Sequence, residues 1–248
     1  MEDEMLFRVL GPVEARWRGR SLPIGGAKRR SVLAAFLLQP GELVPLDEIV
    51  HVVWGPEASS TLRNAAQAHI SRLRKTLSLT PGVQISARSV GYVLQADPEC
   101  IDLHRFRRLV REARASRTAR GAALLYRSAL ELWPDQPLAD IDSPWLSRRF
   151  GTVLEEERFA AVDGWVEAEL QLHGYDAIVA RLTGLVAAHP LRETFREQLI
   201  TALYGTGRKA EALAAYQQAR HYLAEELGVE PGERLRKVFE SILCVDRR

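Results

Sequence analysis

Cysteine is almost absent from this sequence. Cys100 and Cys244 are the only two cysteines in 248 residues, and no histidine stands next to either of them. A disulfide framework and a zinc site are therefore both unsupported. The six histidines are never separated by four positions, so no pair of imidazole ligands lies on one helix face. We expect the protein to hold no metal and no other cofactor.

Long apolar runs and catalytic motifs are missing as well. No hydrophobic stretch approaches the ~18 residues of a membrane-spanning helix, and the N-terminal sequence MEDEMLFR is acidic where a secretory signal is basic. The glycine-rich nucleotide loops, the zinc-protease motif and the G-x-S-x-G motif of hydrolases do not occur. We therefore expect a cytoplasmic protein with no membrane partner and no enzymatic activity.

The sequence does contain enough apolar residues for two domains. Hydrophobic residues make up 46% of the chain and charged residues 27%, which is typical of a folded globular protein. Domains of ~100 to 150 residues are the commonest size, so a single core is not expected to serve the whole chain. Strand-forming segments are confined to the first hundred residues. We predict an α+β domain over residues 1–98 and an all-α domain over residues 99–248.

The first domain has the order of elements of a winged helix-turn-helix. Short segments rich in β-formers predict a small antiparallel sheet, and three amphipathic helices and a β-hairpin follow. In this fold the third helix enters the major groove of DNA, and the hairpin, or wing, lies along the backbone or the minor groove. The predicted elements are Leu6–Leu10, Val13–Trp17, Ser21–Ile24, Lys28–Leu38, Leu46–Trp54, Thr61–Leu77, Val83–Ile85 and Tyr92–Gln95.

The predicted helices differ in what they bury. The second helix is expected to bury Leu46, Ile49, Val50 and Val53. A helical period of ~3.6 residues places an apolar stripe on the third helix, while its opposite face has no acidic residue. A solvated face normally mixes charges of both signs, so this face is unusual. The stripe consists of Ala66, Ile70, Leu73 and Leu77.

The acid-free face suits DNA. Arginine and lysine bind phosphates or guanine, whereas asparagine and glutamine bind adenine. A core helix with a basic outer surface is the alternative interpretation. We assign base contacts to the first half of the face and phosphate contacts to Arg74 and Lys75, with Arg88 anchoring the wing. The residues placed in the major groove are Asn64, Gln67, Ser71 and Arg72, and Ala68 on the same face is a further candidate DNA-binding residue.

Three consecutive cations open the first helix. Lys28, Arg29 and Arg30 oppose the helix dipole by up to ~1 kcal/mol each, so another interaction is expected to favour them. A DNA phosphate and a partner protein are both candidates for that interaction. A solvated cluster without a role is the alternative.

Motifs in the third helix and the wing resemble those of a known family. His69–Leu77 reads HISRLRKTL and Arg88–Tyr92 reads RSVGY, which are similar to the helix end and wing turn of OmpR-type winged helices. Together with Leu10–Val13 and Asp47–Gly55, they narrow the resemblance to the Streptomyces antibiotic regulatory protein family. The resemblance adds Tyr92 to the candidate DNA-binding residues, and Gly91 is expected to let the wing backbone approach DNA.

The second domain is predicted to consist of helical repeats. Asp102 is expected to cap a helix through Ala115. Two later segments are spaced by 34 residues, which is the tetratricopeptide period. The first segment precedes them by 56 residues, and this longer spacing leaves room for an insert from Asp135 to Pro144. The repeated positions press antiparallel helices together, so we expect them to be structural. They are Ala122, Tyr126, Ala129, Ile178, Leu182, Leu185, Ala212, Tyr216 and Ala219.

Motifs in this domain resemble the bacterial transcriptional activation domain of the same family, notably Ile101–Phe106, His189–Glu193 and Glu226–Gly232. The resemblance implies a pathway-specific transcriptional activator of secondary-metabolite (antibiotic) genes. Such activators bind direct repeats in double-stranded DNA, as a homodimer or as side-by-side protomers, and recruit the RNA polymerase holoenzyme. The loop that the resemblance turns toward the polymerase consists of Pro56, Glu57, Ala58, Ser59 and Ser60.

Two other functions fit the residues. A tetratricopeptide-type adaptor would bind proteins through its helical repeats, while the first domain only docks. A repressor would use the same DNA-binding domain, and the residues alone do not distinguish it from an activator. If the protein is a DNA-binding regulator, we expect it to be cytoplasmic and associated with the nucleoid.

Overall fold

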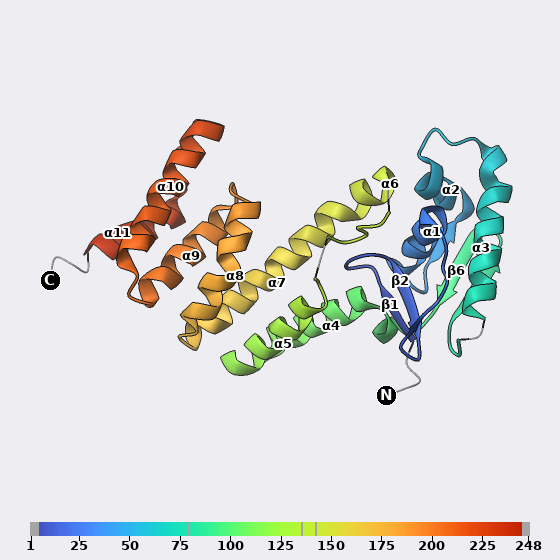
Figure 1. The fold of residues 1–248 in the computed structure, drawn as a ribbon, viewed down its shortest axis with the longest axis horizontal. Helices are drawn as coiled ribbons and strands as arrows, with labels where there is room; N and C mark the ends of the chain where they lie inside the picture. The colour runs from blue at the N-terminus through green and yellow to red at the C-terminus, as the bar shows by residue number, and fades with distance from the viewer. Residues whose placement is uncertain (1–4, 79, 135, 142, 245–248) are drawn as a thin grey trace. The chain divides into compact units, whose positions relative to one another are not determined.

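In the part of the chain that it describes, a computed structural model shows two small sheets and three α-helices within the first hundred residues, and helices without strands beyond them (Figure 1). The structure describes residues 5–78, 80–134, 136–141 and 143–244, so Asp135, where the predicted insert begins, lies outside the described residues. Contacts divide the chain into two units, Met1–Ala113 with Leu125–Ala161, and Arg114–Leu124 with Val162–Arg248. The domain boundary between residues 98 and 99 stays a prediction.

The first sheet is antiparallel with the order β1-β2-β3, as predicted. It consists of β1 (Met5–Arg8), β2 (Glu14–Trp17) and β3 (Arg20–Ser21). The turn between β2 and β3 places Arg18 and Gly19 at φ of 51° and 72°, a region that glycine adopts at little cost. Phe7 and Ala15, which are paired across the strands, are both buried.

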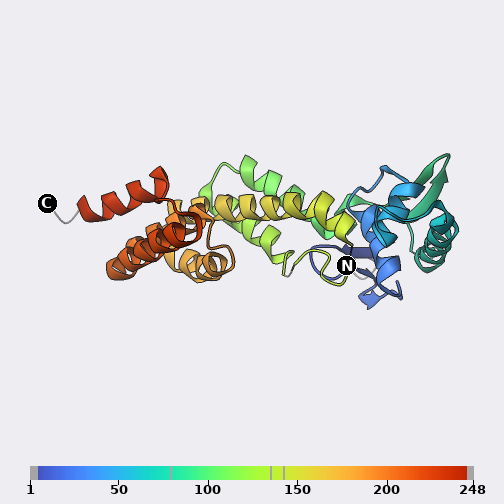
Figure 2. The same ribbon diagram turned by 90° about the horizontal axis from the view of Figure 1, so that it is seen from above.

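The winged helix is present in the predicted order. Its helices are α1 (Ala27–Leu37), α2 (Leu46–Trp54) and α3 (Arg63–Leu77), and its hairpin strands are β5 (Gln84–Arg88) and β6 (Gly91–Gln95). A 3-10 turn, η1 (Ser60–Leu62), leads into α3, so the α-helix begins two residues after Thr61. In Figure 2 the teal α3 lies beside the green wing strands. The fold class predicted for this part of the chain is confirmed.

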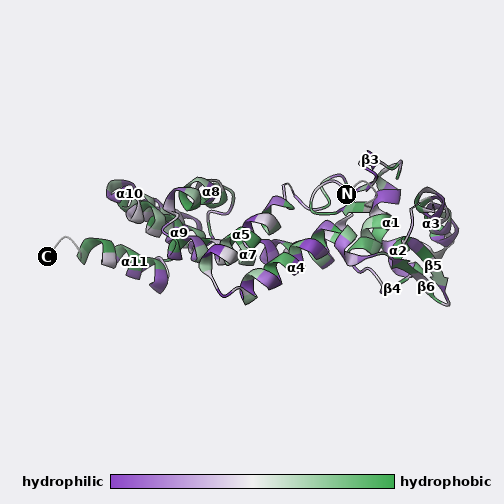
Figure 3. Ribbon diagram, turned by 90° about the horizontal axis from the view of Figure 1, so that it is seen from below, coloured by the Kyte–Doolittle hydropathy of each residue, from purple (hydrophilic) through white to green (hydrophobic). Residues whose placement is uncertain are grey.

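The core of the winged helix is formed by α1 and by one side of α2 and α3. All of Ser31–Leu37 is buried, and Figure 3 shows α1 as largely hydrophobic and α3 as largely hydrophilic. The stripe predicted on α3 is buried as expected. On α2 the prediction was wrong at one position: Val52 is buried and Val53 is only half-buried. Val52 also lies where residues 143–146 pack against α2, a contact that the helical period of α2 alone does not reveal.

A third strand in the wing sheet was not predicted. β4 (Leu43–Pro45) pairs with β6, which gives the order β4-β6-β5 and leaves β5 at the edge. The structure also gives Gly91 a role different from the expected approach to DNA. A Cβ at Gly91 would lie 2.2 Å from the Val44 carbonyl oxygen and 2.8 Å from Pro45 Cα. Glycine is therefore needed so that β4 can pack against β6 next to the turn of the wing.

The remaining helices carry the predicted repeats. α8 packs against α9, and α9 packs against both α10 and α11, as antiparallel helix pairs do. Most of the repeat positions are buried, which agrees with a structural role, whereas Ala122 and Leu185 are only half-buried. The buried ones are Tyr126, Ala129, Ile178, Leu182, Ala212, Tyr216 and Ala219. The helices are α4 (Asp102–Ala115), α5 (Ala119–Glu131), α6 (Pro144–Leu146), α7 (Thr152–Gln171), α8 (Tyr175–Ala188), α9 (Glu193–Gly205), α10 (Lys209–Leu227) and α11 (Glu233–Cys244).

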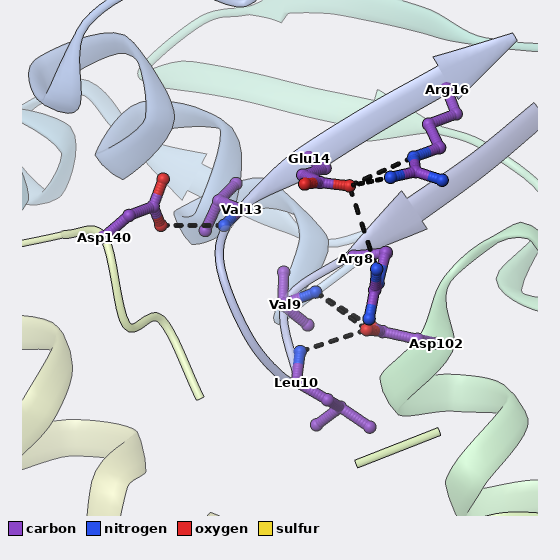
Figure 4. A network of polar contacts seen from close by, with 8 residues as sticks. All are labelled: Arg8, Val9, Leu10, Val13, Glu14, Arg16, Asp102 and Asp140. Carbon is purple, nitrogen blue, oxygen red and sulfur yellow. Dashed lines mark hydrogen bonds and ion pairs between the residues drawn. The ribbon is translucent and has the colours of Figure 1, made fainter. Parts of the chain in front are cut away.

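Asp102 joins the start of α4 to the first sheet, which is more than the helix cap that was predicted. Its carboxylate accepts hydrogen bonds from the backbone N–H groups of Val9 (2.9 Å) and Leu10 (3.0 Å), which Figure 4 shows, and from that of Leu103 (2.8 Å). The side chain is 3% exposed. Burial raises the pKa of Asp102 to about 6, although the backbone hydrogen bonds and Arg8 act in the opposite direction.

The segment 138–151 also contacts the winged helix. Asp140 accepts a hydrogen bond from the Val13 N–H at 2.7 Å (Figure 4) and forms an ion pair with Arg30 of α1 at 2.5 Å. The Ser143 hydroxyl donates to the Val52 carbonyl at 2.7 Å, and α6 packs against α2. Together with Asp102, these contacts fix the first sheet, α1 and α2 to residues of the following region.

Candidate nucleic-acid interface

The outer face of α3 is exposed along its whole length. Ala66, Ile70, Leu73 and Leu77 are at most 1% exposed, so the opposite side chains must point to solvent. A helix that presents side chains in this way is narrow enough to enter the major groove of B-DNA. The exposed residues are the predicted set of Asn64, Gln67, Ala68, Ser71, Arg72, Arg74 and Lys75.

The side chains of this face differ in their freedom. The Arg72 and Lys75 side chains are both exposed, and the charge of Arg72 contributes to lowering the pKa of the nearby His69. Arg74 is different, because its Nε donates to the Ile85 carbonyl oxygen at 2.7 Å. At the start of the helix, Arg63 pairs with Asp47 of α2 at 3.2 Å. The central part of the face is therefore available to a ligand.

The first turn of α1 lies close to the middle of α3. Lys28 Nζ is 5.3 Å from the centroid of the Trp54 ring, and the His69 ring is 5.9 Å from the same ring. Burial, followed by the positive charges of Arg72, Arg29 and Lys28, lowers the pKa of His69. His69 is therefore neutral at pH 7. Lys28 and Arg29 of α1, which lie near it, extend the positive surface of α3. Sequence reasoning gave no role to His69, because its helical position is next to the buried stripe.

Arg30 does not share this surface in the same way. It forms the ion pair with Asp140, and its guanidinium also donates to the Gly25 carbonyl at 2.8 Å. Only contacts between residues more than a hundred positions apart reveal this role, so no sequence signal could have predicted it. Of the three cations predicted as phosphate or partner contacts, Lys28 and Arg29 are the ones that remain beside α3.

The wing presents a cation near its tip. Arg88 is exposed and pairs with Gly91 in the β5–β6 register, with the turn Ser89–Val90 between them. Val90 is 60% exposed, so the tip extends into solvent. Tyr92 is half-buried, with the Arg74 guanidinium carbon 5.4 Å from its ring centroid. The structure thus places Arg88 and Tyr92 on the same hairpin, in neighbouring residue pairs next to the turn.

The loop between α2 and α3 is a separate surface. Pro56, Glu57 and Ser59 are exposed and Ala58 is half-buried, while the side chain of Ser60 is not described. The Ser59 hydroxyl oxygen accepts from the Thr61 N–H at 3.3 Å, which orders the approach to α3.

No metal centre or membrane span is present in the described part of the chain. Within those residues, no group of three or more His, Cys, Asp or Glu side chains is arranged to hold a metal ion. No helix there is both long and apolar enough to cross a membrane.

Two family profiles match the chain. The family described as "Transcriptional regulatory protein, C terminal" matches residues 24–94, and "Bacterial transcriptional activator domain" matches residues 101–243. A solved structure of EmbR from Mycobacterium tuberculosis, in complex with a low-affinity phosphopeptide, aligns with a TM-score of 0.87 at 32% identity. The alignment covers 97% of this chain and 65% of that one. The two-part fold is the same.

Several curated relatives are similar over nearly the whole chain. The regulatory protein AfsR of Streptomyces coelicolor is 40% identical over 97% of this chain, which spans only 24% of AfsR. The transcriptional regulator RedD of the same organism is 36% identical, with 97% of this chain and 71% of RedD covered. The regulatory protein DnrI of Streptomyces peucetius is 30% identical, with 98% and 93% covered.

Proposed function

Because this chain belongs to the Streptomyces antibiotic regulatory protein family, we propose that it is a sequence-specific DNA-binding activator of transcription. The observation that carries the proposal is the exposed face of α3, which combines amides, a hydroxyl and cations and has no carboxylate. The genes it controls are proposed to be those of a secondary-metabolite pathway, as the family resemblance implies. The chain spans about a quarter of the length of AfsR. These roles are therefore proposed for this chain alone and are not taken from the whole of AfsR.

The face of α3 divides into readers and anchors. Asn64, Gln67, Ser71 and Arg72 are proposed to contact base edges, with Ala68 packed between them in the groove. Phosphate contacts fix the register of the helix but carry little sequence information. The proposed phosphate contacts are Lys75 on α3, Lys28 and Arg29 on α1, and Arg88 on the wing, while Arg74 and Tyr92 lie where α3 meets the wing.

Activation requires a contact with the transcription machinery. A single winged helix covers few base pairs, so two protomers are proposed to bind side by side on direct repeats. The loop Pro56–Ser60, in which Pro56, Glu57 and Ser59 are exposed, precedes α3 and is proposed to contact the RNA polymerase holoenzyme. The protein would act in the cytoplasm, on the nucleoid.

The salt dependence of binding tests the DNA-binding proposal against the adaptor alternative. Each phosphate contact lowers the slope of log K against log salt by ~0.9, so four contacts per protomer predict a slope of about −3 to −4. A promoter-region duplex is titrated by fluorescence anisotropy between about 50 and 200 mM salt. Lys75→Ala should reduce the steepness by about 1. Arg234→Ala, which removes a cation paired with Glu197, is the matched control and should leave the slope unchanged.

Two results would contradict the proposal. Binding that does not depend on salt, or no binding to duplex DNA at all, would favour the protein-binding adaptor. In vitro transcription with purified polymerase separates an activator from a repressor, because an activator raises the amount of transcript from the bound promoter. A fall in transcript would establish the repressor instead.

A further inference from the structure

The last turn of α3 is joined to both strands of the wing by a single side chain. Arg74 Nε donates to the carbonyl oxygen of Ile85 in β5 at 2.7 Å. The guanidinium carbon of the same residue lies 5.4 Å from the centroid of the Tyr92 ring in β6. An arginine can do both because its planar guanidinium donates in the plane and stacks on an aromatic ring with its face.

Packing also joins β5 to the helix, because α3 contacts β5 and the Ile85 side chain is buried. Within the described residues, β5 is the edge strand of the β4-β6-β5 sheet and pairs with β6. Between β5 and the end of α3 there is an open cavity of about 450 Å³, lined by Arg74, Leu77, Val83, Ile85 and Ser86 among others. The cavity is open to solvent, while Leu77, Val83 and Ile85 in its lining are buried. The Arg74 bridge lies beside this opening and adds a polar connection to the packing of α3 against β5.

Two connections hold the wing in position. Strand β4 and the hydrogen bond from the Leu46 N–H to the Val90 carbonyl oxygen at 3.1 Å join it to the start of α2, and the Arg74 bridge joins it to the end of α3. Arg88 is three residues beyond Ile85 on the same strand, which is about 10 Å at the usual strand rise. A change of about 15° in the direction of β5 at Ile85 would move Arg88 by about 3 Å, since displacement grows with distance along the strand. A displacement of that size is enough to break a hydrogen-bonded contact with a phosphate.

We propose that Arg74 is a positioning residue, which holds the wing at a fixed angle to α3 so that Arg88 reaches the DNA backbone. Arg74 does not itself anchor a phosphate, whereas its neighbour Lys75, which is exposed on the same turn, does. This inference rests on the proposed DNA-binding function. It replaces the phosphate role that the sequence suggested for Arg74.

A set of binding measurements distinguishes the two roles of Arg74. Arg74→Lys keeps the positive charge but loses the planar donor and the stacking on Tyr92. If Arg74 positions the wing, Arg74→Lys and Arg88→Ala should each weaken DNA binding about tenfold and reduce the salt slope by about 0.9. The double variant should bind within about twofold of either single variant, because both changes remove the same contact.

Lys75→Ala combined with Arg88→Ala is the matched control. The two residues make separate phosphate contacts, so their losses should multiply to about a hundredfold. If Arg74 is a phosphate anchor, Arg74→Lys should bind like the wild type while Arg74→Gln binds weakly. In that case the double variant Arg74→Gln, Arg88→Ala should bind DNA about a hundredfold more weakly than the wild type. Wild-type affinity of Arg74→Lys, or this hundredfold loss in the double variant, would overturn the proposal.

A measurement without DNA tests the positioning role of Arg74 separately from the proposed DNA-binding function. Heteronuclear relaxation by NMR should show increased motion of residues 85–92 in Arg74→Lys and in Tyr92→Leu, compared with the wild type and with Lys75→Ala. An unchanged wing in both variants would refute the positioning role even if DNA binding is lost. Conversely, increased wing motion in the two variants, together with no DNA binding by the wild type, would support the positioning role and refute the proposed function. Tyr92→Leu retains the Arg74 side chain, so it remains informative if Arg74→Lys fails to fold.

Discussion

Replacing Asp102 by alanine should destabilise the junction between the first sheet and α4, by an amount that depends on pH. The substitution leaves the N–H groups of Val9 and Leu10 without an acceptor, and both residues are fully buried, so water does not replace the carboxylate. Each buried donor left without a partner costs about 1 to 3 kcal/mol, so the pair costs about 4 kcal/mol. This is the cost of Asp102→Ala when the Asp102 carboxyl group of the wild type is protonated.

The ionisation of Asp102 reduces that cost at neutral pH. Burial raises its pKa from 3.8 to about 6, so between these values the folded state binds a proton that the unfolded state has released. The contribution of Asp102 to stability is therefore complete below pH ~4 and is lost as the pH rises through ~6. The total loss is about 3 kcal/mol, of which about 1 kcal/mol has occurred by pH 4.5. Asp102→Ala should then cost about 3 kcal/mol at pH 4.5 and about 1 kcal/mol at pH 7.

Hydrogen exchange measures this effect at the atoms concerned. Exchange of the Val9 and Leu10 amides in Asp102→Ala, relative to the wild type, should accelerate about a hundredfold at pH 4.5 and about fivefold at pH 7, once intrinsic rates are corrected for pH. Exchange of the Ile200 and Ala202 amides in α9 provides an internal reference. Equal acceleration at the two pH values would refute the raised pKa. No acceleration at either pH would refute the role of the carboxylate as an acceptor.

The other predictions concern the wing, the ion pair of α1 and the ionisation of Asp102. Gly91→Ala should lower the free energy of unfolding by about 3 kcal/mol or more, because the new Cβ would overlap the Val44 carbonyl; a loss below 1 kcal/mol in urea denaturation would show that β4 shifts easily. Arg30→Ala and Asp140→Ala should each cost about 1 to 2 kcal/mol, with a coupling of about 1 kcal/mol in the double variant; additive losses would mean that the pair contributes nothing. Asp102→Asn should remove the stability loss between pH 4 and 6.5, as equilibrium denaturation at a series of pH values would show.

The sequence was sufficient for the features that depend on local periodicity. The stripe Ala66, Ile70, Leu73 and Leu77 recurs at helical spacing, and the structure buries all four residues. The order of helices and hairpin followed from turn residues such as Gly55 and Gly82, which both adopt positive φ. Because burial of one helix face exposes the other, the candidate reading surface of α3 followed directly from the same pattern.

Features that depend on distant contacts were not accessible in this way. β4 has only three residues, one of them proline and one buried, which is too short for an alternating pattern. The roles of Arg30 and Asp102 depend on Asp140 and on Val9, each about a hundred residues away. Similarly, Arg74 looked like an additional surface cation, because nothing in its local sequence indicates that Ile85 and Tyr92 lie beside it.

The most direct test of the central claim compares Arg72 with Lys75 on α3. Affinities of the wild type, Arg72→Ala and Lys75→Ala are measured on a duplex selected by the wild-type protein and on a random duplex, at one salt concentration. Arg72→Ala should cost about 1 to 3 kcal/mol on the selected duplex and almost nothing on the random one. Lys75→Ala should weaken both equally. If Arg72→Ala weakens binding to both duplexes by the same factor, α3 does not read the sequence through Arg72 and the account is wrong.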